Sequence, residues 1–531
     1  MKKYLLTLFA CFLLPLISFS QVIEWQNTIG GSYSETLFSI SQTTDKGYIL
    51  GGCSISNISG DKTENNNGGT DYWIVKTDSA GIIQWQNTIG GSSYDNLYSV
   101  QQTSDGGYIL GGSSESDQSG DKTENSNGGN DYWLVKTDSL GNILWQNTIG
   151  GSANDGFQSL AQTTDGGYLL GGYSYSNISG DKTENSNGNT DYWIVKTDSL
   201  GNILWQKTIG GSGYDFLLSI SQTTDGGIIL GGASSSNISG DKTENSNGSN
   251  DYWIIKMDNS GGIQWQNSIG GSASDYLHSI ALTTDGGYIL GGKSTSDISG
   301  DKTENGNGDF DYWIVKIDTA GAIQWQNNIG GSSMDILIST IQTIDGGYLL
   351  GGYSYSNISG DKTENNNGYV DYWIVKTDSL GVIQWQNSIG GGLDNYLHAI
   401  DHTSDGGFIL GGNSSSNISG DKTENSIGSA DYWIIKLHEN LNSLTEFLNK
   451  NEILLLYPNP ANSTLTIETS KLMASGSKLS VTDVAGRTLL TKSLDVNVSK
   501  HQIDISSFSS GIYFVQLDGG TGIERGRFVK E

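Results

Sequence analysis

Short segments that alternate polar and apolar residues recur along most of the chain. In one stretch, four such segments are rich in aromatic and β-branched residues: 71–78, 82–90, 97–103 and 108–113. This composition with a period of two is typical of β-strands. Asp105-Gly106-Gly107 predicts a tight hairpin turn, because glycine tolerates a positive φ. Since the pattern has neither helical periodicity nor helix caps, we expect an all-β fold.

The pattern repeats every 60 residues without an insertion. In each repeat one tryptophan begins a Trp-Gln pair and another ends an Asp-Tyr-Trp triplet, and these account for all 14 tryptophans. The two series start at Trp25 and Trp73 and reach Trp385 and Trp433. Seven repeats therefore occupy residues 22–441, a regularity that indicates a repeat architecture.

The segments at the two ends of the repeat region predict a closed ring. The region starts with an isolated Trp-Gln segment at 22–30 and ends at 431–436 without one. Pairing of these segments would complete a last four-stranded sheet and remove two open sheet edges. We therefore predict a seven-bladed β-propeller with 60-residue blades and terminal strand closure. A linear β-solenoid is the alternative, although its coils are usually shorter and need caps.

The repeats resemble the propeller repeats of bacterial exported proteins that contain Trp and Asp-Gly-Gly. The resemblance rests on the two tryptophan series and on the Asp-Gly-Gly turn, and it covers the whole repeat region. It implies the propeller fold and carries no information about activity.

Both ends of the chain carry features of exported proteins. Residues 1–20 are predicted to be a secretory signal peptide, because Lys2 and Lys3 precede an apolar stretch that ends in small residues. No other apolar run is long enough for a transmembrane span, so we expect none in the mature chain. Residues 442–454 are predicted to be a linker. Residues 455–531 contain alternating strand-like runs and predict a small antiparallel β-sandwich.

Residues 455–531 are similar to the type A sorting domain of the type IX secretion system. The residues that carry the similarity occur in the expected order: Tyr457, Pro458, Asn459, Pro460, Gly486, Gly511, Tyr513 and Lys530. The similarity implies a source of the Bacteroidetes type, and passage through the periplasm and across the outer membrane. It implies two partners, the type IX secretion machinery and a sortase-like protease that removes the domain. The expected location is secreted or on the outer-membrane surface.

Charge and cysteine content exclude several kinds of partner and site. The chain has 57 acidic and 28 basic side chains and a formal net charge of −29. A surface of this sign repels phosphates, so we expect no nucleic-acid partner. The two cysteines are Cys11, in the predicted signal peptide, and Cys53. Without Cys11, the mature chain can form neither an internal disulfide nor a cysteine metal site.

A polar loop of about fifteen residues in each repeat is a candidate calcium site. Carboxylate and amide oxygens are the ligands that Ca²⁺ prefers, and Gly68 permits a sharp turn among them. The candidate ligands in the first two loops are Asp61, Glu64, Asn65, Asn67, Asp71, Asp121, Glu124, Asn125, Asn127 and Asp131. Thr63 interrupts the usual ligand order. The alternative is that these side chains bond their own backbone and order the loop.

Residues that vary between repeats concentrate at loop tips that we expect to share one face. Variation on loops over a constant scaffold is where binding usually resides, although neutral drift of exposed tips gives the same pattern. The candidate binding residues are Thr70, Asn130, Thr190, Asn250, Phe310, Val370, Tyr94 and Tyr214.

The sequence favours a binding function over catalysis. It contains no Gly-x-Ser-x-Gly elbow, phosphate loop or zinc-helix motif, and no histidine recurs in every repeat. Equivalent repeats give equivalent environments, whereas a catalytic carboxylate pair needs different ones. We therefore predict a multivalent module without enzymatic activity that binds a glycan or a protein through its loop face. The alternatives are a carboxylate-based glycoside hydrolase and a purely structural envelope protein.

Overall fold

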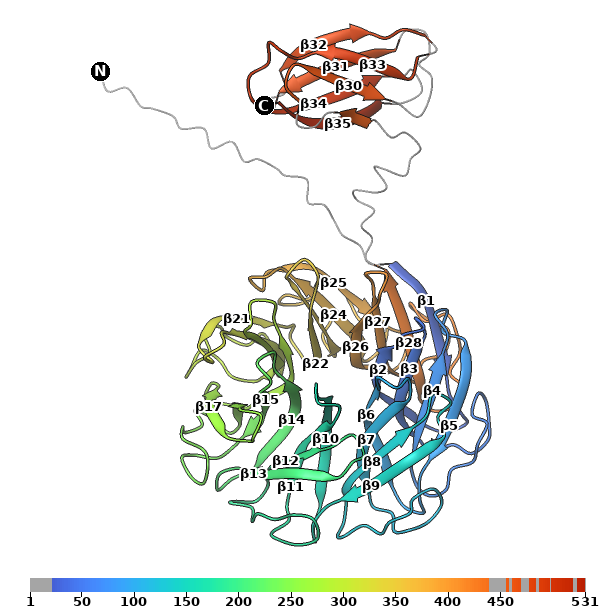
Figure 1. The fold of residues 1–531 in the computed structure, drawn as a ribbon, viewed down its shortest axis with the longest axis vertical. Coiled ribbons are helices and arrows are strands. Elements are labelled where there is room, and N and C mark those ends of the chain that lie inside the picture. Colours follow the sequence, from blue (N-terminus) through green and yellow to red (C-terminus); the bar gives the residue numbers. More distant parts are fainter. Residues whose placement is uncertain are drawn as a thin grey trace, which may run out of the picture. The chain divides into compact units, whose positions relative to one another are not determined.

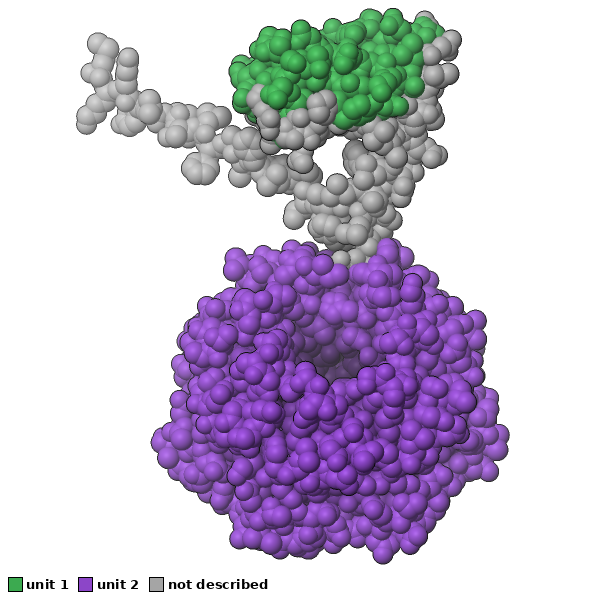
Figure 2. All heavy atoms as spheres, in the orientation of Figure 1, with its two compact units in different colours: residues 1–19, 440–531 green, residues 20–439 purple. Residues whose placement is uncertain are grey.

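The computed structural model describes residues 22–438, 455–457, 461–468, 477–483, 487–496, 498–518 and 523–530. The chain divides into two compact units, residues 20–439 and residues 1–19 with 440–531, and each is considered by itself (Figure 2). The predicted signal peptide and the predicted linker at 442–454 lie outside the described residues. The described residues form strands and no helix, and so contain no helix that could cross a membrane.

Residues 22–438 form four-stranded antiparallel sheets arranged around a centre in a propeller-like fold (Figure 1). The strands of the first three sheets are β2 (Glu35–Gln42), β3 (Tyr48–Ser54), β4 (Asp71–Thr77) and β5 (Ile83–Ile89); β6 (Asp95–Gln102), β7 (Tyr108–Ser114), β8 (Asp131–Thr137) and β9 (Ile143–Ile149); β10 (Asp155–Gln162), β11 (Tyr168–Ser174), β12 (Asp191–Thr197) and β13 (Ile203–Ile209). The next three consist of β14 (Asp215–Gln222), β15 (Ile228–Ser234), β16 (Asp251–Met257) and β17 (Ile263–Ile269); β18 (Asp275–Leu282), β19 (Tyr288–Ser294), β20 (Asp311–Ile317) and β21 (Ile323–Ile329); β22 (Asp335–Gln342), β23 (Tyr348–Ser354), β24 (Asp371–Thr377) and β25 (Ile383–Ile389). The last contains β26 (Asn395–His402), β27 (Phe408–Ser414), β28 (Asp431–His438) and β1 (Val22–Ile29).

The last sheet combines the two ends of the repeat region. Strand β1 pairs antiparallel with β28, and Gln26 lies opposite Ile435 in this register. The Trp433 indole Nε1 donates to Gln26 Oε1 at 3.0 Å, and the equivalent bond joins Trp73 to Gln86 within the first sheet. The N-terminal segment therefore occupies the same place in the last sheet as β5 in the first.

Neighbouring sheets pack through an aromatic contact that repeats around the unit. Tyr72 Oη donates to the main-chain carbonyl of Trp133 in the next sheet at 3.0 Å, and the two rings lie 4.8 Å apart between centroids. Both side chains are fully buried. The same bond recurs between every successive pair of sheets, and Tyr432 of the last sheet donates to Trp73 of the first. Buried Tyr and Trp thus satisfy their polar groups while they supply apolar contact between the sheets.

Two glycines of the second strand in each sheet allow the sheets to approach closely. A Cβ atom on Gly51 would lie 2.6 Å from Val100 Cγ1 of the next sheet, and one on Gly52 would lie 2.7 Å from Tyr432 Oη of the sheet on the other side. Side chains at these positions would therefore push the sheets apart. The Leu-Gly-Gly segment of every repeat has this packing role.

The C-terminal unit is a small β-sandwich, as the sequence predicts. One sheet contains β29 (Leu455–Tyr457), β30 (Thr464–Glu468) and β33 (Lys500–Asp504); the other contains β32 (Thr488–Ser493), β31 (Lys478–Asp483), β34 (Gly511–Asp518) and β35 (Ile523–Lys530). Leu465 and Ile503 of the first sheet share one buried core with Val481, Val515 and Phe528 of the second. Inward-facing residues of both sheets therefore form its core.

Four of the predicted sorting residues lie in described strands of this unit. Tyr457 is in β29 and Lys530 ends β35. Gly511 is the first residue of β34, and Tyr513 lies two residues further along it. Tyr513 is buried, and its Oη donates to the Ser509 carbonyl at 2.7 Å. Pro458, Asn459, Pro460 and Gly486 lie outside the described residues.

Candidate ligand-binding face

The long and short loops of the repeats meet on one face, which we call the loop face. It comprises the loops before each inner strand, such as 30–34, and those between the second and third strands, such as 55–70. The amide of Asp95 donates to the Thr70 carbonyl at 2.6 Å, so the end of one long loop is fixed to the next sheet. The same bond forms at each following repeat. At the end of the last long loop, the carbonyl of Ala430 accepts from the amide of Glu35 at 2.7 Å. The opposite face carries only tight turns. Between these faces, a hollow opens at the centre of the unit (Figure 2).

Aromatic side chains of neighbouring sheets gather in two clusters on the loop face. The first consists of Tyr173, Tyr175, Tyr214 and Phe216. Tyr173 packs edge-on against Phe216 with ring centroids 5.0 Å apart, and Tyr214 stacks on Phe216 at 6.1 Å. Tyr175 is 43% exposed and Tyr214 is 46% exposed. The cluster therefore presents aromatic rings to solvent over a packed base.

The second cluster, three repeats further on, has the same base. It consists of Tyr353, Tyr355, Tyr369 and Tyr396. Tyr353 packs edge-on against Tyr396 at 5.0 Å, as Tyr173 does against Phe216. The hydroxyls of Tyr355 and Tyr396 lie 3.3 Å apart, and Tyr369 is 72% exposed. Burial, followed by the contact with Tyr355, raises the pKa of Tyr396, so its hydroxyl stays protonated.

The structure separates the predicted binding residues into surface and buried positions. Tyr94 is 55% exposed and, like Tyr214, contributes a ring to the loop face. Thr70, Asn130, Asn250 and Phe310 are half-buried.

Thr190 and Val370 are fully buried, so their predicted place at exposed loop tips is wrong. Each carbonyl accepts an amide hydrogen of the next sheet at 2.9 Å, as the corresponding carbonyls of the other repeats do. These two residues belong to the contact between sheets.

Sequence reasoning missed most of the aromatic residues of the two clusters. They occupy strand ends rather than loop tips: Tyr173 and Tyr353 lie on second strands, and Phe216 and Tyr396 lie on inner strands. The signal was present, because the position of Tyr173 carries a different residue in nearly every repeat: Cys53, Ser113, Tyr173, Ala233, Lys293, Tyr353 and Asn413.

The predicted calcium ligands do not converge on one point. Asp61 accepts from the Gly30 amide at 3.1 Å, Glu64 from the Thr88 amide at 2.6 Å and Asn65 from the Ile58 amide at 3.1 Å. The corresponding bonds form at Asp121, Glu124 and Asn125. The side chains of Asn67 and Asn127 bridge to Asp121 and Asp181 of the following loops. This arrangement supports the alternative reading, in which these residues order the loop.

Elsewhere in the described part of the chain, one set of three metal-binding side chains lies close together: Glu24, Asp405 and His438. The Lys436 ammonium lies 2.9 Å from Asp405 and 3.8 Å from Glu24. This ammonium already pairs with Asp405, and we assign no metal to this set.

Asp71 and Asp131, the remaining predicted ligands, are buried between sheets. Asp71 Oδ2 accepts from the Asn67 amide at 2.5 Å, while Oδ1 has no hydrogen-bond partner in residues 22–438. Burial first, and then the neighbouring Asp95 carboxylate, raise the pKa of Asp71 to about 7. In the same way, burial first, and then the neighbouring Asp155 carboxylate, raise the pKa of Asp131 to about 7. Each is therefore one member of a buried acid pair.

One contact between sheets has an amide in place of the second acid. Asn395 stands where Asp95 stands in the second repeat, and its Nδ2 donates to Asp371 Oδ1 at 3.1 Å. At the contact between the last and the first sheets, Glu35 takes the place of the second acid. Burial first, and then the charge of Glu35 and a hydrogen bond with it, raise the pKa of Asp431 to about 6. An amide donor in the place of an acid indicates that the acid pairs share a proton.

The histidines on the inner strands do not form a catalytic group. Burial lowers the pKa of His278 to about 3 and that of His398 to about 4, so both are neutral at physiological pH. His398 Nε2 lies 3.0 Å from Asn413 Oδ1, and its ring packs against Phe38. These residues vary with Phe38 and Tyr98 at one position of the inner strands.

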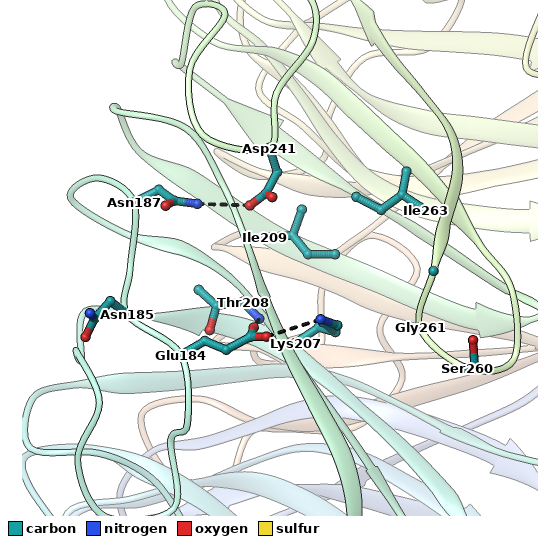
Figure 3. A pocket seen from close by; sticks show the side chains of 11 residues that line it. Glu184, Asn185, Asn187, Lys207, Thr208, Ile209, Asp241, Ser260, Gly261 and Ile263 are labelled. Carbon is teal, nitrogen blue, oxygen red and sulfur yellow. Dashed lines mark hydrogen bonds and ion pairs between the residues drawn. The ribbon is translucent and has the colours of Figure 1, made fainter.

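An open groove of about 620 Å³ lies near the outer strands, at a position where one repeat differs from the others (Figure 3). In five repeats, an asparagine such as Asn147 donates to the carbonyl of a turn glycine in the next sheet at 2.5–2.6 Å. Lys207 replaces this asparagine and instead pairs with Glu184 at 3.2 Å. A Cβ on Gly261 would lie 3.5 Å from the Trp205 ring, against 2.7 Å between Gly201 and Trp145. The lost bond thus leaves the turn further from the neighbouring strand.

Lys207→Asn is expected to restore this bond and raise the free energy of unfolding by about 0.5–1.5 kcal/mol, the net value of one such hydrogen bond. Asn267→Lys, which removes the intact bond one repeat later, should lower it by a similar amount. Denaturant unfolding of both variants checks the pair. A Lys207→Asn protein no more stable than the parent would contradict this explanation of the groove.

Comparison with known proteins identifies the C-terminal unit. Residues 455–531 match the family described as the secretion system C-terminal sorting domain. This match confirms the predicted type IX sorting domain. Such a tail implies interaction with the type IX secretion machinery and export to the cell surface or secretion.

The chain also has similarities of low sequence identity to other known proteins. The regulatory protein FlaEY of Caulobacter vibrioides is 24% identical over 139 residues, which are 25% of this chain and 15% of FlaEY. The chain thus spans a small part of that relative. The crystal structure of puromycin hydrolase is 10% identical with a TM-score of 0.44, over 85% of this chain and 61% of the hydrolase. An apocarotenoid oxygenase mutant of Synechocystis is 8% identical with a TM-score of 0.35, over 91% and 96% of the two chains.

Proposed function

We propose that the protein is an exported binding module whose loop face binds glycans at several aromatic subsites. The observation that carries this proposal is the pair of aromatic clusters around Tyr173 and Tyr353, placed at equivalent positions on a nearly constant scaffold. Tyrosine offers a large and rigid contact area at low entropic cost, and surrounding Ser, Asn and Gly residues supply hydrogen bonds. The C–H face of a sugar ring packs well on such a ring.

The scaffold in this proposal is a closed seven-bladed propeller. The pairing of β1 with β28 supports closure, as does the Tyr432–Trp73 bond between the last and first sheets. A closed ring holds the aromatic clusters at fixed distances. Fixed spacing favours a chain-like ligand that reaches several subsites, because the second contact is then intramolecular.

A glycan fits the loop face better than a protein partner. Hot spots of protein interfaces usually cluster near the centre of a contact. Here the centre of the unit is hollow, and the aromatic clusters lie in different sheets around it. A protein ligand remains the second outcome of the binding test below.

A binding function also accounts for the acidic pairs better than hydrolysis does. The carboxylates of the acid pairs, such as Asp71 and Asp95, have raised pKa values and are fully buried. A glycosidase needs two carboxyl groups that reach opposite sides of the scissile bond. These pairs face each other between sheets, where a sugar cannot enter.

The test is a glycan array followed by titration of the best ligand. Tyr175→Ala and Tyr355→Ala should each weaken binding about tenfold, since truncation of an aromatic contact at a binding hot spot typically costs more than 1 kcal/mol. The double variant should lose more than either alone, because it removes both subsites. Leu140→Ala, at a residue that is 65% exposed on the opposite face, is the control. Binding unaffected by the double variant would overturn the proposal.

A further inference from the structure

Lys293 differs from the recurrent lysines of the repeats in position and partners. Residues 22–438 contain 17 lysines, and 14 of them recur at the two positions of Lys62 and Lys76. These are buried, and Lys76 and its counterparts form ion pairs such as Lys76–Asp45 at 2.9 Å. Lys293 stands where the other repeats have neutral residues, and it has no ion pair within residues 22–438.

Two aromatic rings flank the Lys293 ammonium. Its Nζ lies 4.8 Å from the centroid of the Phe310 ring and 5.3 Å from that of Tyr276. Tyr276 is directly opposite Lys293 on β18, and Phe310 immediately precedes β20. All three side chains therefore meet at the loop-face end of one sheet. We call this group the Lys293 subsite.

The polar atoms of the subsite leave hydrogen-bond donors for a ligand. Asn250 Nδ2 donates to Tyr276 Oη at 3.0 Å, so the tyrosine oxygen accepts a bond and keeps its own hydrogen to donate. The ammonium of Lys293 adds further donors. Burial lowers the pKa of Lys293, because the two rings replace water around its charge without supplying a negative partner. A bound anion would supply that partner.

We infer that the Lys293 subsite recognises the carboxylate of an acidic sugar, with the adjoining ring of the sugar packed on Phe310. The inference rests on the proposed function and names the class of glycan. A molecule with a net charge of −29 repels acidic ligands in general. Screening in physiological salt limits that repulsion to about 8 Å, so one local ammonium is enough to reverse it. The subsite therefore determines specificity for an acidic residue within a longer glycan.

The test uses the full mature chain, uronic-acid oligosaccharides and their carboxyl-reduced counterparts, which are neutral and otherwise matched. The parent protein should bind the acidic member of a pair about tenfold more tightly, equivalent to ~1.4 kcal/mol. Lys293→Met keeps the length of the side chain and should abolish this preference, while Lys293→Arg should retain it. Lys46→Met removes the same charge from a tight turn on the opposite face and should change nothing. The preference should also decline as salt is added.

Two results separate this inference from the proposed function. Equal binding of acidic and reduced oligosaccharides, or a preference that survives Lys293→Met, overturns the subsite while glycan binding stands. If every glycan fails to bind and a protein binds instead, both are overturned. Thermal unfolding of each variant shows whether it has folded, and Lys293→Arg keeps the test valid if the Met variant does not.

Discussion

Removal of residues 22–30 is expected to lower the free energy of unfolding of the repeat unit by about 4–7 kcal/mol. The loss comprises the burial of two large apolar side chains, at about 1.5–3 kcal/mol each, and at least one hydrogen bond of about 1 kcal/mol. Ile29 is 2% exposed, the Trp25 ring packs 5.7 Å from that of Tyr48, and Gln26 accepts from Trp433. The truncated protein also leaves β28 as an open edge, which invites association.

Thermal unfolding and light scattering of the truncated chain provide the measurement. Addition of a peptide with the sequence of residues 22–30 should restore the transition temperature, whereas a scrambled peptide of the same composition should not. An open spiral would not depend on this strand. A truncated chain that stays monomeric and melts at the parent temperature would therefore falsify the closed propeller.

The strands could be predicted because their sequence repeats seven times. Comparison of the copies shows which positions are constant, and constant Trp, Tyr and Gly residues are those of the contact between sheets. In the stretch 71–113, the other strand ends differ from prediction by one residue at most, but β6 begins at Asp95, two residues earlier than expected. Asp95 extends the strand because its amide bonds to the Thr70 carbonyl. That partner lies in the preceding sheet, beyond the reach of local patterns.

The candidate site was predicted less well, for the same physical reason. Tyr173 and Phe216 are 43 positions apart in sequence and in different repeats, yet their rings are 5.0 Å apart. A position that varies between copies looks tolerant until its neighbour across the contact is known. Asp71 illustrates the converse error, since its spacing from Asn67 suggests a metal ligand. Its decisive neighbour is Asp95, from the next repeat.

Proton sharing in the buried acid pairs should make the repeat unit less stable as the pH rises from about 4 to about 7. The pKa of Asp71 is raised to about 7, and those of Asp191 and Asp251 to about 6, first by burial. A carboxyl with a pKa of about 3.9 in the unfolded chain binds fewer protons there than in the folded state. Linkage then makes the folded state most favourable at acidic pH and weaker as the pH passes through the folded-state values.

The aspartates of the tight turns, such as Asp105, instead make the repeat unit less stable at low pH. The pKa of Asp105 is lowered to about 2; burial acts against this shift, while hydrogen bonds from Thr103 and Lys136 cause it. Its contribution to stability is present above about pH 4 and is lost as the pH falls towards 2. Stability should therefore be greatest near pH 4–5, since both sets of carboxyl groups are then close to their preferred states.

Two reciprocal variants isolate the acid pairs from the rest of the charge. Asn395→Asp replaces the native amide by a seventh shared acid and should lower the free energy of unfolding by about 1–3 kcal/mol at pH 7.5, with little effect at pH 4.5. Asp95→Asn copies the native Asn395 arrangement and should raise stability at pH 7.5 by a similar amount. Both changes alter one charge at equivalent positions, and general repulsion would act at both pH values, whereas the acid pair loses stability only as the pH rises towards its raised pKa. Denaturant unfolding of both variants and the parent at pH 4.5 and pH 7.5 measures these differences in the free energy of unfolding. A loss on Asn395→Asp that is the same at pH 4.5 and pH 7.5 would show that packing, and not a shared proton, governs these contacts.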